Sequence, residues 1–203
     1  MIAILTADII NSRKVPTEKW LDNFKLLLNQ FGASPKDWEI YRGDEFQLAI
    51  ANPENALWIA FQIKAYFKSM QLDVRMSIGF GEQNYKGEKI TESNGSAFVR
   101  SGELFETLKK QKVNLALNSG NNSFDKDLNL MLRLSASFTD SWLQQSAEFV
   151  LVALQNPTFS QEEIGNILGI NQAAVSRRQK RSHFELLLQL EQSFREKIKT
   201  LAT

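Results

Sequence analysis

The order of strand-like and helix-like segments in the first 120 residues restricts the fold more than any other feature of the chain. Short apolar or alternating runs predict strands, and apolar residues at helical spacing predict helices. The predicted strands cover residues 2–7, 38–41, 45–51, 73–80 and 113–117, and the predicted helices cover 16–31, 53–67 and 96–110. The first six elements follow the order β-α-β-β-α-β, which predicts an α+β, ferredoxin-like domain with its helices on one face of a mainly antiparallel sheet.

The pattern changes after residue 120. From Phe124 onward the chain has only helical spacing, so we expect one domain at 1–120 and an all-α domain at 121–203. The chain has 203 residues, a net charge of +1 and no cysteine, so any basic surface must be local and disulfides are excluded. No apolar run approaches the roughly 20 residues that a membrane span requires. We therefore expect a cytoplasmic protein without a membrane partner.

Residues 160–181 carry the strongest local signal. Ser160 and Glu163 form a capping box that predicts a helix start, and Gly169 allows a sharp turn before Asn171 caps a second helix. Gly165 is small where two helices would approach closely. This spacing resembles that of the helix-turn-helix family over about twenty positions, and it predicts a helix-turn-helix at about 160–181.

The resemblance implies a set of residues that contact duplex DNA. In that family the second helix enters the major groove with its first residues at the base edges. The residues expected to face bases are Gln172, Ala173, Ser176 and Arg177, and those expected to meet phosphates are Arg178, Lys180 and Arg181. The alternative is a helical hairpin with a solvated basic end. Four positive charges within 177–181 favour DNA, whereas Gln179 stands where many relatives carry a leucine and predicts looser packing.

The C-terminal segment has an apolar stripe with two interpretations. Its members, at helical spacing, are Phe184, Leu187, Leu188, Phe194, Ile198 and Leu201. The stripe either packs on its own chain or forms a dimerisation helix, and both interpretations stay open. Because helix-turn-helix proteins commonly pair to read two half-sites, we expect a homodimer. His183 is the only histidine, so a histidine-rich metal site is excluded and a surface or packing role is favoured.

Two carboxylates predict a cation site in the first domain. Asp8 ends the first strand, and Asp44 lies at the tip of the hairpin between the second and third strands. Because these strands are expected to be neighbours, both carboxylates would project from adjacent strand ends. Two carboxylates, phosphate oxygens and water commonly hold Mg²⁺ in phosphoryl-transfer sites. The alternative is an ordinary loop or turn role for each residue.

These segments also resemble a known fold. "ADIINSR", "YRGDEFQLAI" and "VRMSIGFGE" are similar to the palm domain of class III nucleotide cyclases and GGDEF-type cyclases. With "NGSAFVRSGELFE", the similarity over about 1–118 is to the SatD family, whose members pair such a domain with a C-terminal helix-turn-helix. The resemblance implies metal binding by Asp8 and Asp44 and a nucleotide ligand.

Departures from the cyclase pattern bear on activity. Class III cyclases carry an Asn and an Arg that act at the transition state, where this chain has Val99 and Glu103. Arg42 replaces a glycine of the GGDEF motif, and residues 17–31 have no guanine-reading motif. Arg100 and Glu103 remain candidates only for lining the site. Arg42 and Glu45 flank the hairpin tip, where a solvated role is favoured over contact with phosphate or metal. The expected function is a DNA-binding regulator with a degenerate sensing or dimerisation domain. The alternative is a metal-dependent nucleotide cyclase or nucleotidyl-transferring enzyme.

Overall fold

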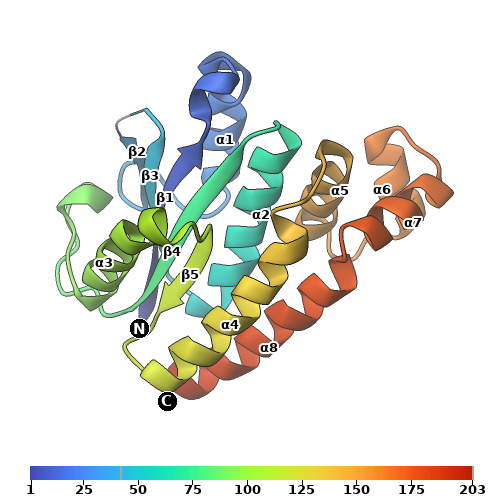
Figure 1. Ribbon diagram of the computed structural model, residues 1–203. Helices are drawn as coiled ribbons and strands as arrows, with labels where there is room; N and C mark the ends of the chain where they lie inside the picture. The colour runs from blue at the N-terminus through green and yellow to red at the C-terminus, as the bar shows by residue number, and fades with distance from the viewer. Residues whose placement is uncertain (42, 203) are drawn as a thin grey trace.

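A computed structural model describes residues 1–41 and 43–202, and it has a mixed α and β architecture around one five-stranded sheet (Figure 1). The strands lie in the order β2-β3-β1-β4-β5. Their bounds are Ile2–Ile10 for β1, Trp38–Tyr41 for β2, Glu45–Ile50 for β3, Asp73–Gly81 for β4 and Leu115–Asn118 for β5. The predicted strands are confirmed to within a few residues, since β1 runs three residues further than expected and β5 begins two residues later. Among the strand pairs of the described residues, β4–β5 is parallel and the other three are antiparallel.

The apolar face of the sheet is covered by α1 (Leu21–Leu28) and α2 (Ala56–Ser69). Every second residue of β1 faces this side, so Leu5, Ala7 and Ile9 are buried in the same core as the two helices. Aromatic side chains hold the layers together, since the Phe24 ring lies 4.9 Å from Phe46 and 4.6 Å from Phe67. The first helix is shorter than predicted, because residues 17–19 form a separate 3₁₀ turn before it and the helix ends at Leu28.

The third helix, α3 (Ser96–Gln111), lies on the opposite face of the sheet, which corrects the expectation that helices cover one face only. The contact is close because the facing residues are small. A Cβ on Gly79 would come within 2.3 Å of the Ala97 carbonyl oxygen. Polar groups here are paired, with Ser101 donating to Thr6 at 2.7 Å and Ser77 donating to the Ser101 carbonyl at 2.8 Å. The sequence did not reveal this face because its residues are small and polar.

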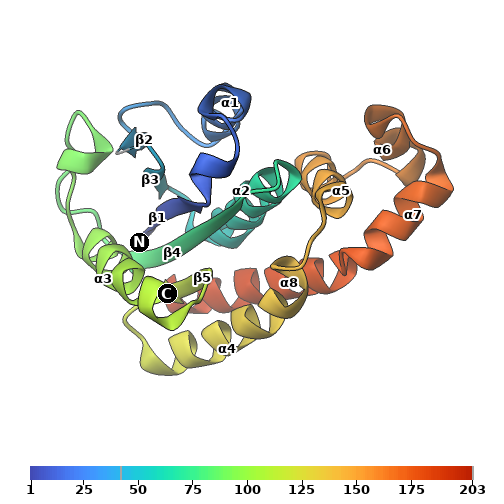
Figure 2. The ribbon, with the colours of Figure 1, turned by 45° about the horizontal axis from the view of Figure 1, so that its top comes forward.

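The C-terminal helices are α4 (Asn122–Thr139), α5 (Gln144–Gln155), α6 (Gln161–Leu168), α7 (Gln172–Arg181) and α8 (Phe184–Ala202). Three of them, α4, α5 and α8, pack on α2 and β5 and share one continuous core with the sheet. Phe194 of α8 approaches Phe80 of β4, with ring centroids 6.0 Å apart. By contrast, α6 and α7 project from one end of the molecule in both ribbon views (Figures 1 and 2). The predicted boundary near residue 120 therefore separates elements that share a core.

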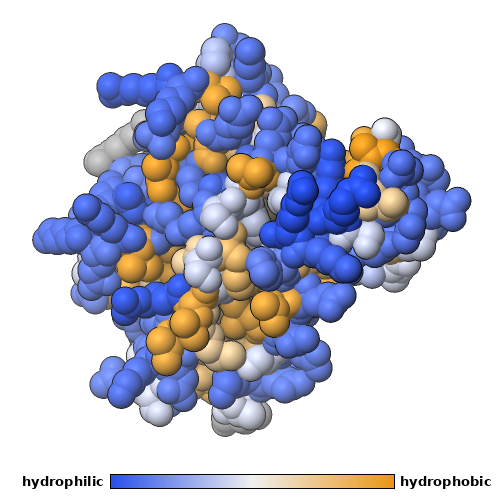
Figure 3. All heavy atoms as spheres, turned by 45° about the vertical axis from the view of Figure 1, so that its right-hand side comes forward, coloured by the Kyte–Doolittle hydropathy of each residue, from blue (hydrophilic) through white to orange (hydrophobic). Residues whose placement is uncertain are grey.

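The apolar stripe of α8 packs on its own chain, because Leu187, Phe194 and Ile198 are completely buried. This observation removes the stripe as an argument for a homodimer. Other leucines are exposed instead, among them Leu134 of α4 and Leu186 of α8, which line an open groove of about 620 Å³ between the two helices. Figure 3 shows apolar side chains gathered on this side of the molecule. Within the described residues, no helix combines the length and hydropathy needed to cross a bilayer.

Candidate nucleic-acid interface and carboxylate cluster

The projecting α6–α7 pair is built by local sequence signals. The Ser160 side chain accepts a bond from the Glu163 amide at 3.3 Å, and the Glu163 carboxylate accepts one from the Ser160 amide at 2.7 Å, which is the predicted capping box. Gly169 ends α6 in the left-handed region with φ of 64°, where a glycine carries no steric penalty. Asn171 then caps α7 by accepting from the Ala174 amide at 2.9 Å. These residues fix the turn between the helices.

Close packing fixes how the two helices meet. Gly165 faces the turn, and a Cβ there would lie 2.6 Å from the Ile170 carbonyl oxygen and 3.4 Å from Val175 Cγ2. Val175 is completely buried beneath α6. The end of α7 is anchored separately, because the Trp142 indole donates to the Ser182 carbonyl at 3.0 Å. The pair is therefore held at both its turn and its base.

The residues predicted to contact DNA lie mainly on the outer side of α7. Gln172, Ala173 and Arg177 are exposed, as are Lys180 and Arg181, whereas Ser176 is half-buried. Positions 173, 177, 180 and 181 share one side of the helix because they are separated by one or two turns. Strongly hydrophilic side chains, dark blue in Figure 3, gather beside the projecting lobe. The fold thus leaves one basic helix side open to solvent.

Arg178 is the member of this set that the structure places differently. Its Nη1 lies 3.0 Å from Oε2 of Glu148 on α5, and it also donates to the Gln145 carbonyl at 3.3 Å. The guanidinium therefore joins α7 to α5. Of the three residues predicted to meet phosphates, Lys180 and Arg181 are the exposed ones.

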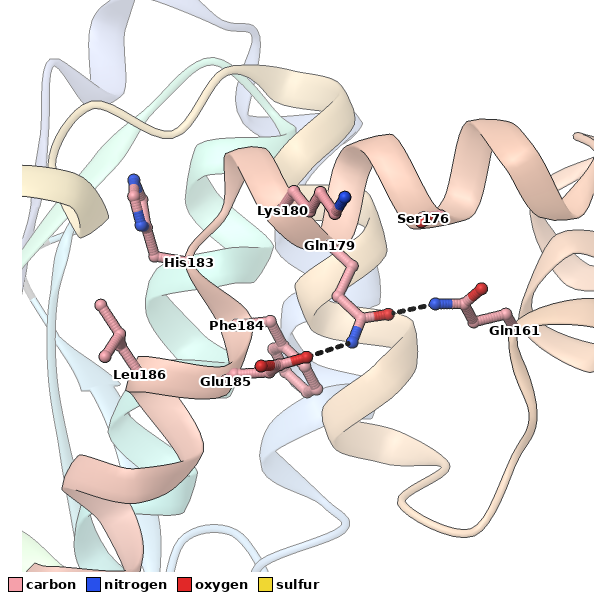
Figure 4. Close-up of a pocket in the computed structure, with 8 residues that line it drawn as sticks. All are labelled: Gln161, Ser176, Gln179, Lys180, His183, Phe184, Glu185 and Leu186. Carbon is pink, nitrogen blue, oxygen red and sulfur yellow. Dashed lines mark hydrogen bonds between the residues drawn. The ribbon is translucent and has the colours of Figure 1, made fainter.

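Gln179, which predicted looser packing, is in fact hydrogen-bonded on both sides. Its Oε1 accepts from Gln161 Nε2 at 2.7 Å, and its Nε2 donates to Glu185 Oε1 at 3.4 Å (Figure 4). These residues line a pocket of about 300 Å³ between α6, α7 and the start of α8. His183 lines the same pocket and is exposed, and its ring lies 5.3 Å from that of Phe138, so it is a surface residue with one aromatic contact. Gln161 is a residue that the sequence interpretation missed.

The predicted cation site at Asp8 and Asp44 already contains basic side chains. Asp8 lies opposite Glu45 in the β1–β3 pair, and the Ile9 amide donates to the Asp44 carbonyl at 2.9 Å, so the hairpin tip adjoins β1 as expected. However, Asp8 Oδ2 lies 3.2 Å from Arg75 Nη1 and 3.8 Å from Lys109 Nζ. Lys109 also lies 3.7 Å from Glu45 Oε1. The sequence did not indicate these two partners, because they come from β4 and α3.

The carboxylate cluster consists of Asp8, Asp44 and Glu45, with Arg75 and Lys109 beside them. Burial raises the pKa of Asp8, Arg75 and Lys109 oppose that shift, and the neighbouring carboxylates Asp44 and Glu45 add to it. Asp44 accepts a hydrogen bond from the Ser12 hydroxyl at 3.0 Å. Within residues 1–41 and 43–202, no three acidic or histidine side chains are arranged as ligands of one metal ion. As arranged, the cluster is a poor fit to Mg²⁺, because basic side chains occupy the positions beside Asp8.

The other residues considered for this site lie elsewhere. Arg100 donates to the Phe80 carbonyl at 2.6 Å, and Phe80 pairs with Ala3, so Arg100 lies at the end of β1 opposite to Asp8. Val99 and Glu103 are exposed on α3, and Arg42 lies outside the described residues. Beside Asp44, a pocket of about 350 Å³ is lined by Ser12, Arg13 and neighbouring residues.

Replacing Lys109 tests whether this side chain weakens the binding of a divalent cation to the cluster. We expect Lys109→Gln to strengthen Mn²⁺ binding by at least about fivefold, because two unit charges 4 Å apart interact by about 1 kcal/mol even in bulk water. Titration calorimetry with MnCl₂ measures the change. Lys110→Gln, the next and also exposed residue of α3, is the matched control and should leave the affinity unchanged. Equal affinities for the two variants, or a gain that survives Asp8→Asn, would contradict this account.

Comparison with known proteins places the chain in a family. The model of the SatD family matches residues 1–198, and the chain therefore belongs to the SatD family. A search of curated proteins gave no match, and a search of solved structures gave none.

Proposed function

We propose that this SatD-family protein is a DNA-binding regulator in which α7 docks in the major groove of duplex DNA. The observation that carries the proposal is the exposed side of α7, where Ala173, Arg177, Lys180 and Arg181 face solvent on a helix pair that projects from the molecule. A projecting basic helix fits the groove and neutralises phosphates on either side of it. The homodimer that would read two half-sites stays part of this proposal.

In this proposal the sheet domain is a degenerate, cyclase-like palm that senses a nucleotide or supports dimerisation. Its first four strands have the order β2-β3-β1-β4, and a pocket adjoins Asp44. The pairing of Asp8 with Arg75 and Lys109 favours a site that has lost metal-dependent catalysis. The enzyme alternative keeps one supporting observation, namely that the strand end carrying Asp8 adjoins the hairpin tip carrying Asp44.

Salt-dependent binding tests the regulator proposal. The affinity of the wild-type protein for duplex DNA should fall steeply between about 50 and 200 mM salt, because binding releases counterions from the phosphates. Arg177→Ala should weaken binding by roughly 5- to 150-fold, which is the range for losing one arginine–guanine contact. Fluorescence anisotropy with labelled duplexes measures both effects.

The matched control is Arg133→Ala, which removes an exposed arginine from α4 rather than α7. It should leave the affinity within error of the wild type. Equal weakening by both variants would show that the protein responds to net charge alone, and undiminished binding by Arg177→Ala would remove α7 from the interface.

A further inference from the structure

A chain of side-chain hydrogen bonds connects the first residue of α7 to α8. Gln172 Nε2 donates to Gln161 Oε1 at 2.6 Å, and Gln161 Nε2 donates to Gln179 Oε1 at 2.7 Å. Gln179 Nε2 in turn donates to Glu185 Oε1 at 3.4 Å. Figure 4 shows the last two links, with Gln161 reaching from α6 toward α7. We refer to Gln161, Gln179 and Glu185 as the amide relay.

The carboxylate at the end of the relay sets the direction of every bond in it. An ionised glutamate only accepts hydrogen bonds, so Gln179 must turn its NH₂ group toward Glu185 and its oxygen toward Gln161. Gln161 must then offer its NH₂ group to Gln179 and its oxygen to Gln172. Consequently Gln172 turns its NH₂ group toward Gln161, and flipping any one amide would place two donors or two acceptors face to face.

This orientation leaves Gln172 with the donor and acceptor that adenine requires. The Nε2 group has two hydrogens, and only one is used by Gln161. A bidentate contact uses Oε1 and the Nε2 hydrogen on the same edge of the amide, so the bond to Gln161 must use the other hydrogen. An adenine presents an N7 acceptor beside an N6 donor in the major groove, which is the complement of that edge.

We propose that the amide relay is a positioning device that holds Gln172 ready to read one adenine, an inference that rests on the proposed DNA-binding function. Gln172 is the contact residue, and the relay acts through it. Because the relay restricts the rotation of an otherwise mobile exposed side chain before DNA arrives, the contact costs less ordering on binding. The expected ligand is a duplex with adenine at one fixed position of each half-site.

Selection from a randomised duplex library with the full-length protein tests this inference. Wild type should recover a motif in which adenine is preferred at one position by roughly 5- to 150-fold, the range for one bidentate pair. Gln172→Ala should abolish that preference and keep the other positions of the motif. Gln161→Ala should reduce the preference at the same position, and the double variant should match Gln172→Ala, because both changes act on one contact.

Glu185→Gln is the second variant, and it keeps the size of the side chain while replacing an acceptor-only carboxylate with an amide that can also donate. It removes the acceptor-only group that sets the direction of the relay, so it should lower the adenine preference without lowering the melting temperature. An undiminished adenine preference in both Gln161→Ala and Glu185→Gln overturns the relay while leaving DNA binding intact. A wild-type protein that binds no duplex overturns the proposed function, and the inference falls with it.

Discussion

Replacement of Lys64 by methionine should lower the free energy of unfolding by about 3 kcal/mol, the lower end for breaking a buried ion pair. The Lys64 side chain is 1% exposed, and its Nζ lies 3.0 Å from Asp73 and 2.6 Å from Asp140. Methionine fills a similar volume but leaves two partly buried carboxylates with one remaining cation, Lys68. Because the network joins α2, β4 and the end of α4, its loss should loosen the C-terminal helices from the sheet.

Urea denaturation followed by circular dichroism measures this effect. Lys197→Met, at an exposed position of α8, is the control and should change the free energy of unfolding by no more than about 0.5 kcal/mol. Adding Asp140→Asn to Lys64→Met should restore part of the loss, because one uncompensated charge is removed. A Lys64→Met protein as stable as the control would show that the network contributes little.

Two glycine-to-alanine substitutions should have opposite effects on stability. Gly102 lies in α3, and a Cβ added there would meet no neighbouring atom within 4 Å, so Gly102→Ala should stabilise the protein by about 1 kcal/mol through helix propensity. Gly165→Ala gains the same propensity but places its Cβ 2.6 Å from the Ile170 carbonyl oxygen. Since overpacking costs about 1–3 kcal/mol, α6 and α7 should separate locally and DNA binding should be largely lost.

Hydrogen exchange of the backbone amides shows which segment each substitution destabilises. Amide protection should fall within 161–181 in Gly165→Ala and remain unchanged in the sheet. The Gly102→Ala protein should bind DNA as the wild type does. Full protection of α7 in the Gly165→Ala protein, or equal stabilisation by the two substitutions, would contradict the packing described for the helix pair.

The sequence revealed the features that are determined locally. The capping box at Ser160, the left-handed turn at Gly169 and the cap at Asn171 each depend on residues within a few positions, and the structure has all three. The strands were predictable for the same reason, since alternation along 45–50 is a property of one segment. Local chemistry was therefore sufficient for the elements and for the helix pair.

The features that the sequence did not reveal depend on contacts between distant segments. Lys109 meets Asp8 because α3 lies on the second face of the sheet, and small residues such as Gly79 gave no apolar pattern for that face. Arg75 meets Asp8 because β4 pairs with β1 in a register that places the two residues opposite each other. Gln161 stands eleven residues before Gln172, each the first residue of its helix. That repeated glutamine was the available signal, but the bond between them requires the angle at which the helices meet.

The central claim, that α7 enters the major groove, can be measured by cleavage from a single site. Because the chain has no cysteine, Ala173→Cys provides one attachment point for an iron chelate on the exposed side of α7. On a selected duplex, cleavage should be confined to a few neighbouring base pairs, whereas the same reagent on Gln111→Cys, at the end of α3, should give none. Diffuse cleavage from residue 173, or the same cleavage from both sites, would contradict the account.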